Sequence, residues 1–261
     1  MLVPDRRQHR GPHPEDHELF APSQYPRLLT AFGDLCWLLD RGYALPSSLK
    51  LVGDRYQLAA RQRMALERSA CTREELLKRR SRQKEVHSLR GLPLYLDGYN
   101  VLTTMEAALG GGVLIRGRDG TLRDMASMHG SYRKVQETVA AIHLIGKGLA
   151  ELGVSIARWY LDKPVSNSGR LAKLIRELAA EHGWPWQVEI VQSPDYLLME
   201  CPDLVATADS VILDYCEGWV NLTDWLVTRY VPTAWVVDFS QMPDDDENKS
   251  GQISSADDPL P

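Results

Sequence analysis

The hydrophobic and polar positions of this chain follow two patterns, and the change lies near residue 92. Between residues 25 and 90 the apolar residues recur three or four positions apart, which is the spacing of amphipathic helices. The Arg41-Gly42 pair ends the first of these helices. The following helices are rich in arginine and fit either a helix-turn-helix or a small bundle with a solvated basic face. The apolar positions of the first helix are Leu28, Leu29, Phe32, Leu35, Cys36, Leu38 and Leu39.

From residue 92 onward, short apolar runs alternate with helical segments. The runs predict strands at 93–97, 155–161, 187–191, 204–207 and 234–238. Helices are predicted at 131–152 and 168–182, because each begins at a polar cap and ends before a glycine. Strands joined by such helices form a parallel sheet covered on both faces. Residues 110–124 contain an Asp-Gly turn and predict a hairpin near the rim of that sheet.

These patterns divide the chain into four segments. We expect a flexible arm at 1–22, a small all-α domain at 23–90, an α/β domain at 91–240 and a disordered tail at 241–261. Residues 79–91 are expected to be an exposed basic linker. Residues 50–90 contain twelve Lys or Arg against five Asp or Glu, a local net charge of +7, whereas the tail has a net charge of −5. A basic segment of this kind can bind a polyanion even though the whole chain has a net charge of −5.

Composition narrows the class of protein further. The 261 residues are 44% hydrophobic and 25% charged, which is typical of a globular chain. The four cysteines are far apart and form no C-x-x-C pair, which fits a reducing compartment. The first twenty residues lack the apolar stretch of a signal peptide, and no run of about 18 apolar residues is present. We therefore expect a cytoplasmic location and no membrane partner.

Carboxylates follow four of the predicted strands. Asp97 ends the first strand, Asp162 follows the second, Asp195 opens a helix after the third, and Asp209 follows the fourth. In an open parallel sheet, ligands bind beyond the carboxyl ends of the strands. Each aspartate taken alone is also a good helix N-cap.

Four carboxylates at one edge would repel one another unless a cation lies among them. Oxygen ligands of this type suit Mg²⁺ or Mn²⁺, and such a site can activate water and stabilise the leaving oxygen of a phosphodiester. Asn100 and Thr207 would then hold the carboxylates or a bound phosphate through hydrogen bonds.

Several segments resemble motifs of the PIN-like and NYN-like nuclease superfamily. "YLDGYNVL" resembles its first motif, a strand ending in D-G-x-N, and "VATADSVILD" is similar to its late T-x-D-S motif. "SPDYLL" has the aspartate that opens a helix, and "WYLDKPVSNSGRLAKLI" is similar to related flap-nuclease-like members. The whole chain also resembles a prokaryotic family that pairs a helical domain of unknown function with such a nuclease-like domain.

The resemblance covers residues 92–240 and implies a PIN-like three-layer sandwich with a central, mainly parallel sheet. It also implies a metal-dependent ribonuclease with Asp97, Asp195 and Asp209 as the matching acids and Asp162 as a fourth. The superfamily's second acid usually lies on the helix after the first strand, where Glu106 is the nearest candidate and Asp124 a substitute. Asp214 is expected to be structural.

Other polar residues are candidates for binding substrate phosphate. His129 and Arg133 precede a long predicted helix whose start favours an anion, and Lys163 and Ser166 follow the second strand. Ser210 belongs to the T-x-D-S motif. The alternative for the serines is ordinary helix capping, and for Arg133 a solvated side chain.

Three functions fit these observations. The favoured one is a metal-dependent ribonuclease whose basic helical segment holds RNA. The main alternative is a PIN-like module that binds RNA or regulates without catalysis. The third is a metal-dependent phosphatase that acts on small phosphoesters.

Overall fold

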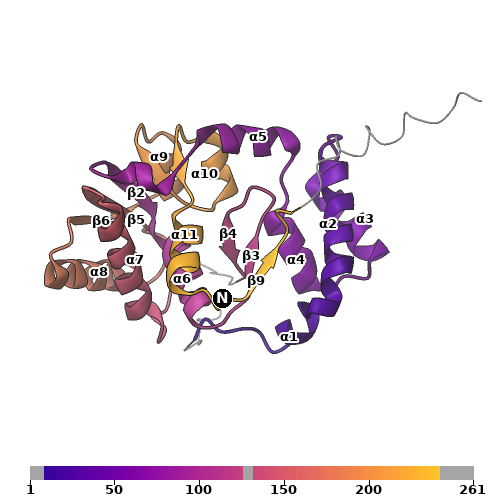
Figure 1. The fold of residues 1–261 in the computed structure, drawn as a ribbon, viewed down its shortest axis with the longest axis horizontal. Coiled ribbons are helices and arrows are strands. Elements are labelled where there is room, and N and C mark those ends of the chain that lie inside the picture. The colour runs from indigo at the N-terminus through magenta and orange to yellow at the C-terminus, as the bar shows by residue number, and fades with distance from the viewer. Residues whose placement is uncertain (1–8, 126–131, 242–261) are drawn as a thin grey trace, which may run out of the picture.

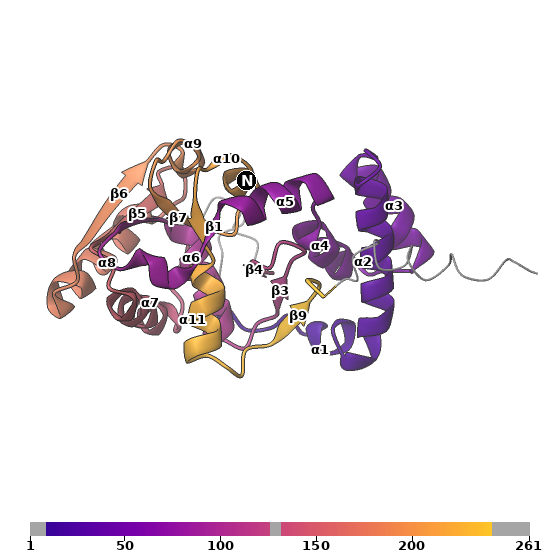
Figure 2. The ribbon, with the colours of Figure 1, turned by 45° about the horizontal axis from the view of Figure 1, so that its top comes forward.

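The computed structural model describes residues 9–125 and 132–241. A group of helices lies at one end of the molecule, a six-stranded sheet with its own helices lies at the other, and three short strands lie between them (Figures 1 and 2). This is an α/β architecture preceded by helices. The tail expected at 241–261 lies outside the described residues, apart from Gln241.

The N-terminal helices from residue 25 onward form where the apolar spacing predicts them, whereas the two shorter helical turns before residue 25 were not predicted. They are α1 (Asp16–Leu19), a 3₁₀ turn (Pro22–Gln24), α2 (Tyr25–Leu39), α3 (Leu45–Arg55), α4 (Ala60–Ser69) and α5 (Arg73–Arg82). In α2, the predicted stripe of Leu28, Phe32 and Leu35 is fully buried. Helix α5 begins with a capping box in which Thr72 and Glu75 bond each other's backbone.

The main sheet is parallel throughout, with the strand order β1-β8-β7-β2-β5-β6. Its strands are β1 (Gln83–Lys84), β2 (Pro93–Asp97), β5 (Ile156–Asp162), β6 (Trp186–Val191), β7 (Leu204–Ala206) and β8 (Trp219–Val220). The helices between them are α6 (Gly98–Leu109), α7 (Thr138–Leu152), α8 (Ser168–His182), α9 (Pro194–Met199), α10 (Ser210–Tyr215) and α11 (Leu222–Tyr230).

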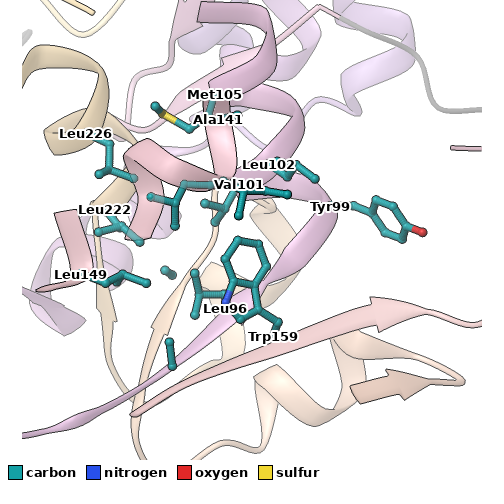
Figure 3. Close-up of a cluster of buried hydrophobic side chains, with 14 of the residues drawn as sticks. Leu96, Tyr99, Val101, Leu102, Met105, Ala141, Leu149, Trp159, Leu222 and Leu226 are labelled. Atoms are coloured by element: carbon teal, nitrogen blue, oxygen red, sulfur yellow. The ribbon is translucent and has the colours of Figure 1, made fainter. Parts of the chain in front are cut away.

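Helices cover both faces of this sheet because its side chains alternate between two cores. Leu96 of β2 and Trp159 of β5 point into one core, which α6, α7, α8 and α11 complete. Figure 3 shows these side chains packed against Val101, Leu149 and Leu226. On the other face, Tyr95 and Tyr160 pack against a smaller core formed by α9 and α10.

The strand predicted at 234–238 forms as β9 (Val236–Asp238), but it does not join the main sheet. It pairs in parallel with β3 (Leu114–Arg116), which pairs antiparallel with β4 (Leu122–Asp124). The predicted hairpin at 110–124 therefore belongs to a second sheet. Leu114 faces the main core, whereas Ile115 faces the core of the N-terminal helices. The second sheet thus joins both parts of the molecule.

The described part of the expected N-terminal arm is packed rather than extended. Arg10 is buried and its Nε donates to Glu106 Oε2 at 2.8 Å, while Arg61 binds both carboxylate oxygens of Asp16. Gly112 allows this approach, because a Cβ there would lie 2.6 Å from the carbonyl oxygen of Arg10. The expectation of a flexible arm was wrong for residues 9–22.

Two further boundaries differ from the expectation. Most of residues 79–91, expected to be an exposed linker, form the end of α5, strand β1 and a 3₁₀ turn at Val86–Leu89. The helix expected at 131–152 begins at Thr138, because the hydroxyl of Thr138 accepts the amide N–H of Val135 and donates to buried Glu106. None of the described helices has the length and apolar character needed to cross a bilayer.

Candidate functional site

The centre of the candidate site lies where the strand order reverses. Strand β2 lies between β5, which follows it in the chain, and β7, which returns after β6 on the other side. Asp97 ends β2 and Thr207 follows β7, so both lie at the carboxyl ends of adjacent strands. A crevice at such a point is the usual ligand site of an open α/β sheet.

Three side chains join the two strand ends. Thr207 Oγ1 donates to Asp97 Oδ2 at 2.9 Å, and Asp97 Oδ1 accepts the amide N–H of Asn100 at 3.4 Å. Asn100 Oδ1 in turn accepts the amide N–H of Ala208 at 2.9 Å. The D-G-x-N motif therefore caps α6 and holds the loop after β7.

Close packing against β5 requires glycine at the second position of that motif. A Cβ at Gly98 would lie 2.6 Å from the carbonyl oxygen of Tyr160 and 2.7 Å from Leu161 Cδ2. Only glycine allows β5 to pass this close to the start of α6. The motif thus sets the spacing between Asp97 and the neighbouring strand end.

The other three acids approach from separate segments. Asp162 is half-buried at the end of β5, and Asp209 caps α10 by accepting the amide N–H groups of Val211 and Ile212 at 2.8 and 3.3 Å. Asp195 is exposed on α9, which packs against α10, β2 and β5, and its charge acts on Asp97. We call Asp97, Asp162, Asp195 and Asp209 the acidic cluster.

Electrostatics shows that these four carboxylates influence one another. Burial, together with the charges of Asp209 and Asp195, raises the pKa of Asp97 to about 7. Burial and the charge of Asp209 raise the pKa of Asp195, and burial and the charge of Asp195 raise the pKa of Asp162. The cluster is therefore a site where an added positive charge would be stabilised.

The donor set suits a hard divalent cation, although its oxygens are not gathered as a complete ligand shell. Within residues 9–125 and 132–241, no group of three or more His, Cys, Asp or Glu is arranged to hold a metal ion. Mg²⁺ commonly binds proteins through one or two carboxylates and keeps several waters, and this arrangement fits such a mode.

Glu106 does not belong to the cluster, and its assignment as a metal ligand was wrong. Its side chain is fully buried and accepts hydrogen bonds from Arg10, Tyr132 and Thr138, the last two at 2.6 Å. These three hydrogen bonds hold Arg10 and the residues at the start of α7 against α6.

Two other acids have structural partners. Asp124 accepts the hydroxyl groups of Thr103 and Thr104 on α6 at 3.0 and 3.2 Å. Asp214, expected to be structural, binds the guanidinium of Arg79 through both oxygens at 2.7 and 3.0 Å.

Sequence reasoning missed Arg123, which supports the loop that carries Asp209. Its Nε donates to the carbonyl oxygen of Ala208 at 2.9 Å, and its Nη2 lies 3.4 Å from Ser210 Oγ. Ser210 is therefore held at the edge of the acidic cluster. Since Arg123 lies in the hairpin, about 85 residues before this loop, no local motif could have indicated the contact.

The predicted phosphate-binding residues lie beside the end of β5. Lys163 and Ser166 are exposed in the loop that follows Asp162, and the carbonyl oxygen of Ser166 accepts the amide N–H of Tyr132. Arg133 is exposed nearby, and His129 lies outside the described residues. A cavity of about 450 Å³, here called the basic groove, opens at this place. Its lining is Tyr132, Arg133, Lys134, Asn167, Arg170, Leu171 and Leu174.

A larger cavity, of about 670 Å³, lies away from the acids among α2, α3 and α5. We call it the arginine-rimmed cleft because Arg55, Arg73, Arg80 and Arg118 line it. It contains none of the residues of the acidic cluster, so the chemistry of the acids and the larger cavity are separate features.

Two family models match this chain. A family model described as a domain of unknown function (DUF5616) matches residues 86–225 and so includes the whole acidic cluster. The chain belongs to this family. A second model, described as a protein of unknown function (DUF434), matches residues 27–82. The expected pairing of a helical segment with a following α/β segment is thus confirmed.

One curated relative is similar to most of the chain. The uncharacterised protein MJ0935 of Methanocaldococcus jannaschii is 32% identical over 180 residues, which are 69% of this chain and 86% of that protein. No solved structure matches the chain. None of these descriptions names an activity.

The raised pKa of Asp97 predicts that this carboxylate destabilises the fold at alkaline pH. Its folded pKa lies above that of an unfolded aspartate, so the penalty grows as pH rises towards 7 and is complete above it. Asp97→Asn should therefore raise the free energy of unfolding, with a gain larger at pH 8 than at pH 5 by about 2 kcal/mol. Urea titrations at the two pH values measure this difference.

The control for this prediction is Asp203→Asn, which changes a carboxylate at the opposite, amino end of β7. It should leave the pH dependence of stability as it is in the unmodified chain. An equal effect of Asp97→Asn at both pH values would show that burial and the neighbouring acids do not raise the pKa of Asp97.

Proposed function

We propose that this chain is a metal-dependent ribonuclease that hydrolyses phosphodiester bonds at the acidic cluster. The observation that carries the proposal is that four carboxylates from four separate segments lie near the reversal point of a parallel sheet, each close enough to influence another electrostatically. Asp97, the most buried of them, has no cationic side chain among its described hydrogen-bond partners.

Helix capping alone accounts for only part of this arrangement. Asp97 and Asp209 both cap helices, and each uses one carboxylate oxygen to do so. Capping does not explain why Thr207 fixes the second oxygen of Asp97, or why α9 brings Asp195 close enough to raise the pKa of its neighbours. Carboxylates that repel their neighbours in this way are costly for stability, which favours a role in binding a cation.

In this proposal Asp97, Asp195, Asp209 and Asp162 would hold Mg²⁺ or Mn²⁺. The bound ion would lower the pKa of a water molecule and neutralise charge on the phosphate. Asn100 and Thr207 orient Asp97 and the loop before Asp209 through the hydrogen bonds described above. The protein thereby supplies a fixed set of acceptors rather than a nucleophile of its own.

The choice of RNA rests on the PIN-like and NYN-like resemblance and on the charges near the site. The basic groove has Lys134 and Arg170 on its lining and no acidic residue. Asn167, in the loop that follows Asp162, lines the groove, and its side-chain amide donates to the carbonyl oxygen of Tyr132. A strand of RNA crossing this groove would place neighbouring phosphates next to the acidic cluster.

The proposal predicts that RNA cleavage requires a divalent metal and the acidic cluster. Purified protein should cleave end-labelled RNA in Mn²⁺ or Mg²⁺ and not in EDTA. The double variant Asp97→Asn, Asp209→Asn should lose about 100-fold or more of this activity because it removes two ligands of the ion. Asp203→Asn, with its carboxylate at the other end of β7, should cleave at the rate of the unmodified chain.

The same assay separates the alternatives. Equal cleavage by the double variant and the unmodified chain would refute the acidic cluster as the catalytic site. Salt-sensitive RNA binding without cleavage in any metal would favour the non-catalytic module. Turnover of a small chromogenic phosphoester, without turnover of RNA, would favour the phosphatase.

A second prediction tests the basic groove. Lys134→Ala combined with Arg170→Ala should weaken RNA binding about tenfold at low salt and make the affinity less dependent on salt, because two phosphate contacts are lost. Filter binding in EDTA at several NaCl concentrations measures both effects. Lys173→Ala is the control. Lys173 lies on α8 like Arg170, but it pairs with Glu177 at 3.7 Å and does not line the groove. Equal effects of the two changes would mean that the groove does not contact RNA.

A further inference from the structure

The arginine-rimmed cleft has an apolar wall that the described residues leave partly exposed, although Arg41 stacks on the ring of Trp37. Trp37 and Leu51 line it and are 47% and 61% exposed. Cys36, Leu38, Val52 and Leu76 also belong to the apolar part of the lining. Large apolar side chains exposed beside a cavity of this size are typical of a binding surface.

The charges of the cleft favour an anionic occupant. Arg118 is paired with Asp40 through two hydrogen bonds of 2.9 Å, and Arg55 lies 3.7 Å from Asp34. These are the two acidic residues in the lining, against four arginines. Arg80 is exposed, and the described part of the chain provides no hydrogen-bond or ion-pair partner for its side chain. An occupant with both carboxylates and apolar groups would satisfy the cleft.

The C-terminal segment of this chain has that chemistry and begins at the cleft. Ser240 lines the cleft and is held at the end of β9, because its N–H and hydroxyl both donate to Asp238 Oδ1 at 2.8 and 2.7 Å. Residues 242–261 carry six acids and one lysine. Their first apolar residue is Met242, and the run Asp-Asp-Asp-Glu occupies 244–247.

The chain between Ser240 and the acidic run is long enough for the run to reach the arginine-rimmed cleft. Residues 244–247 lie four to seven positions after Ser240, so an extended backbone can carry them about 13 to 25 Å from it. Because Ser240 itself lines this cavity of about 670 Å³, the acids at 244–247 can reach its interior. Attachment at the edge also gives the segment an effective concentration in the millimolar range.

We propose that residues 242–261 occupy the arginine-rimmed cleft, with the acids at 244–247 against Arg55, Arg73 and Arg80. The segment covers Trp37 and Leu51 and supplies the negative charge that the lining lacks. It is an intramolecular occupant of a surface that would otherwise attract other polyanions, and its docking weakens as salt rises. The proposal does not depend on the nuclease activity.

The test uses a fluorophore on the full chain. Asn248→Cys introduces one thiol just after the acidic run, whereas the four native cysteines are all at most 4% exposed. Burial also raises the pKa of Cys36 and Cys71 to about 12, so these thiols react slowly. Bimane attached to the introduced thiol is quenched when it contacts tryptophan, and Trp37 is the exposed tryptophan of the cleft.

The expected result is weak bimane emission that rises about twofold or more in Trp37→Phe and also in 1 M NaCl. Neutralising the run with Asp244→Asn, Asp245→Asn, Asp246→Asn and Glu247→Gln should give the same rise without touching the lining of the cleft. Arg80→Glu should act likewise. Lys78→Glu is its control, because Lys78 lies on the same helix over the ring of Tyr215 and not in the cleft.

Emission that is unaffected by Trp37→Phe and by salt would overturn the proposal. A single-stranded RNA that crosslinks to α5 while bimane emission stays high and unchanged would assign the cleft to RNA and also overturn it. Emission that starts low and rises on adding RNA would support it, since it shows displacement of the docked segment.

Discussion

A chain of buried ion pairs centred on Asp119 holds the two halves of this molecule together. Arg79 of α5 donates to Asp119 at 2.6 Å, and Arg123 of β4 binds both oxygens of Asp119 at 3.0 and 2.7 Å. These two guanidinium groups lower the pKa of Asp119 well below its usual range, although burial acts in the opposite direction. Removing one member of such a set leaves an uncompensated buried charge and costs about 3–5 kcal/mol. Because Arg123 also holds Ala208, the position of the acidic cluster depends on the helices before residue 83.

This dependence explains how the fold tolerates crowded carboxylates. Asp97 is buried near Asp195 and Asp209, and its pKa is raised because the charged form is disfavoured there. The clamp of Thr207 and Asn100 fixes the strand ends from one side, and Arg123 fixes the loop after β7 from the other. The hydrogen bonds around the acids therefore stabilise the fold, whereas the burial and mutual repulsion of the acids destabilise it. This division is typical of functional sites, where local strain is offset by the surrounding structure.

Local patterns predicted the parts of the fold that depend on neighbouring residues. The stripe on α2, the strand 93–97 with its D-G-x-N turn and the helix at 168–182 all follow from spacing and capping within one segment. Pairings between distant segments could not be predicted in this way. The sequence of β9 is that of any short buried strand and does not indicate its partner. It pairs with β3 because Val237 and Phe239 complete the core beneath α2 and α4. The position of Glu106 on the helix after the first strand predicts a metal ligand. The sequence gives no sign that Arg10, 96 residues earlier, donates a hydrogen bond to its carboxylate.

The central claim is that the acidic cluster binds a divalent metal, and the most direct test is Mn²⁺ binding measured by electron paramagnetic resonance at pH 6 and pH 8. A cation must displace the proton of Asp97, whose pKa is about 7. The unmodified chain and Asp203→Asn should therefore bind Mn²⁺ about tenfold more tightly at pH 8 than at pH 6. The double variant Asp97→Asn, Asp209→Asn should not bind it measurably. Equal Mn²⁺ affinity in the double variant and the unmodified chain would contradict the account.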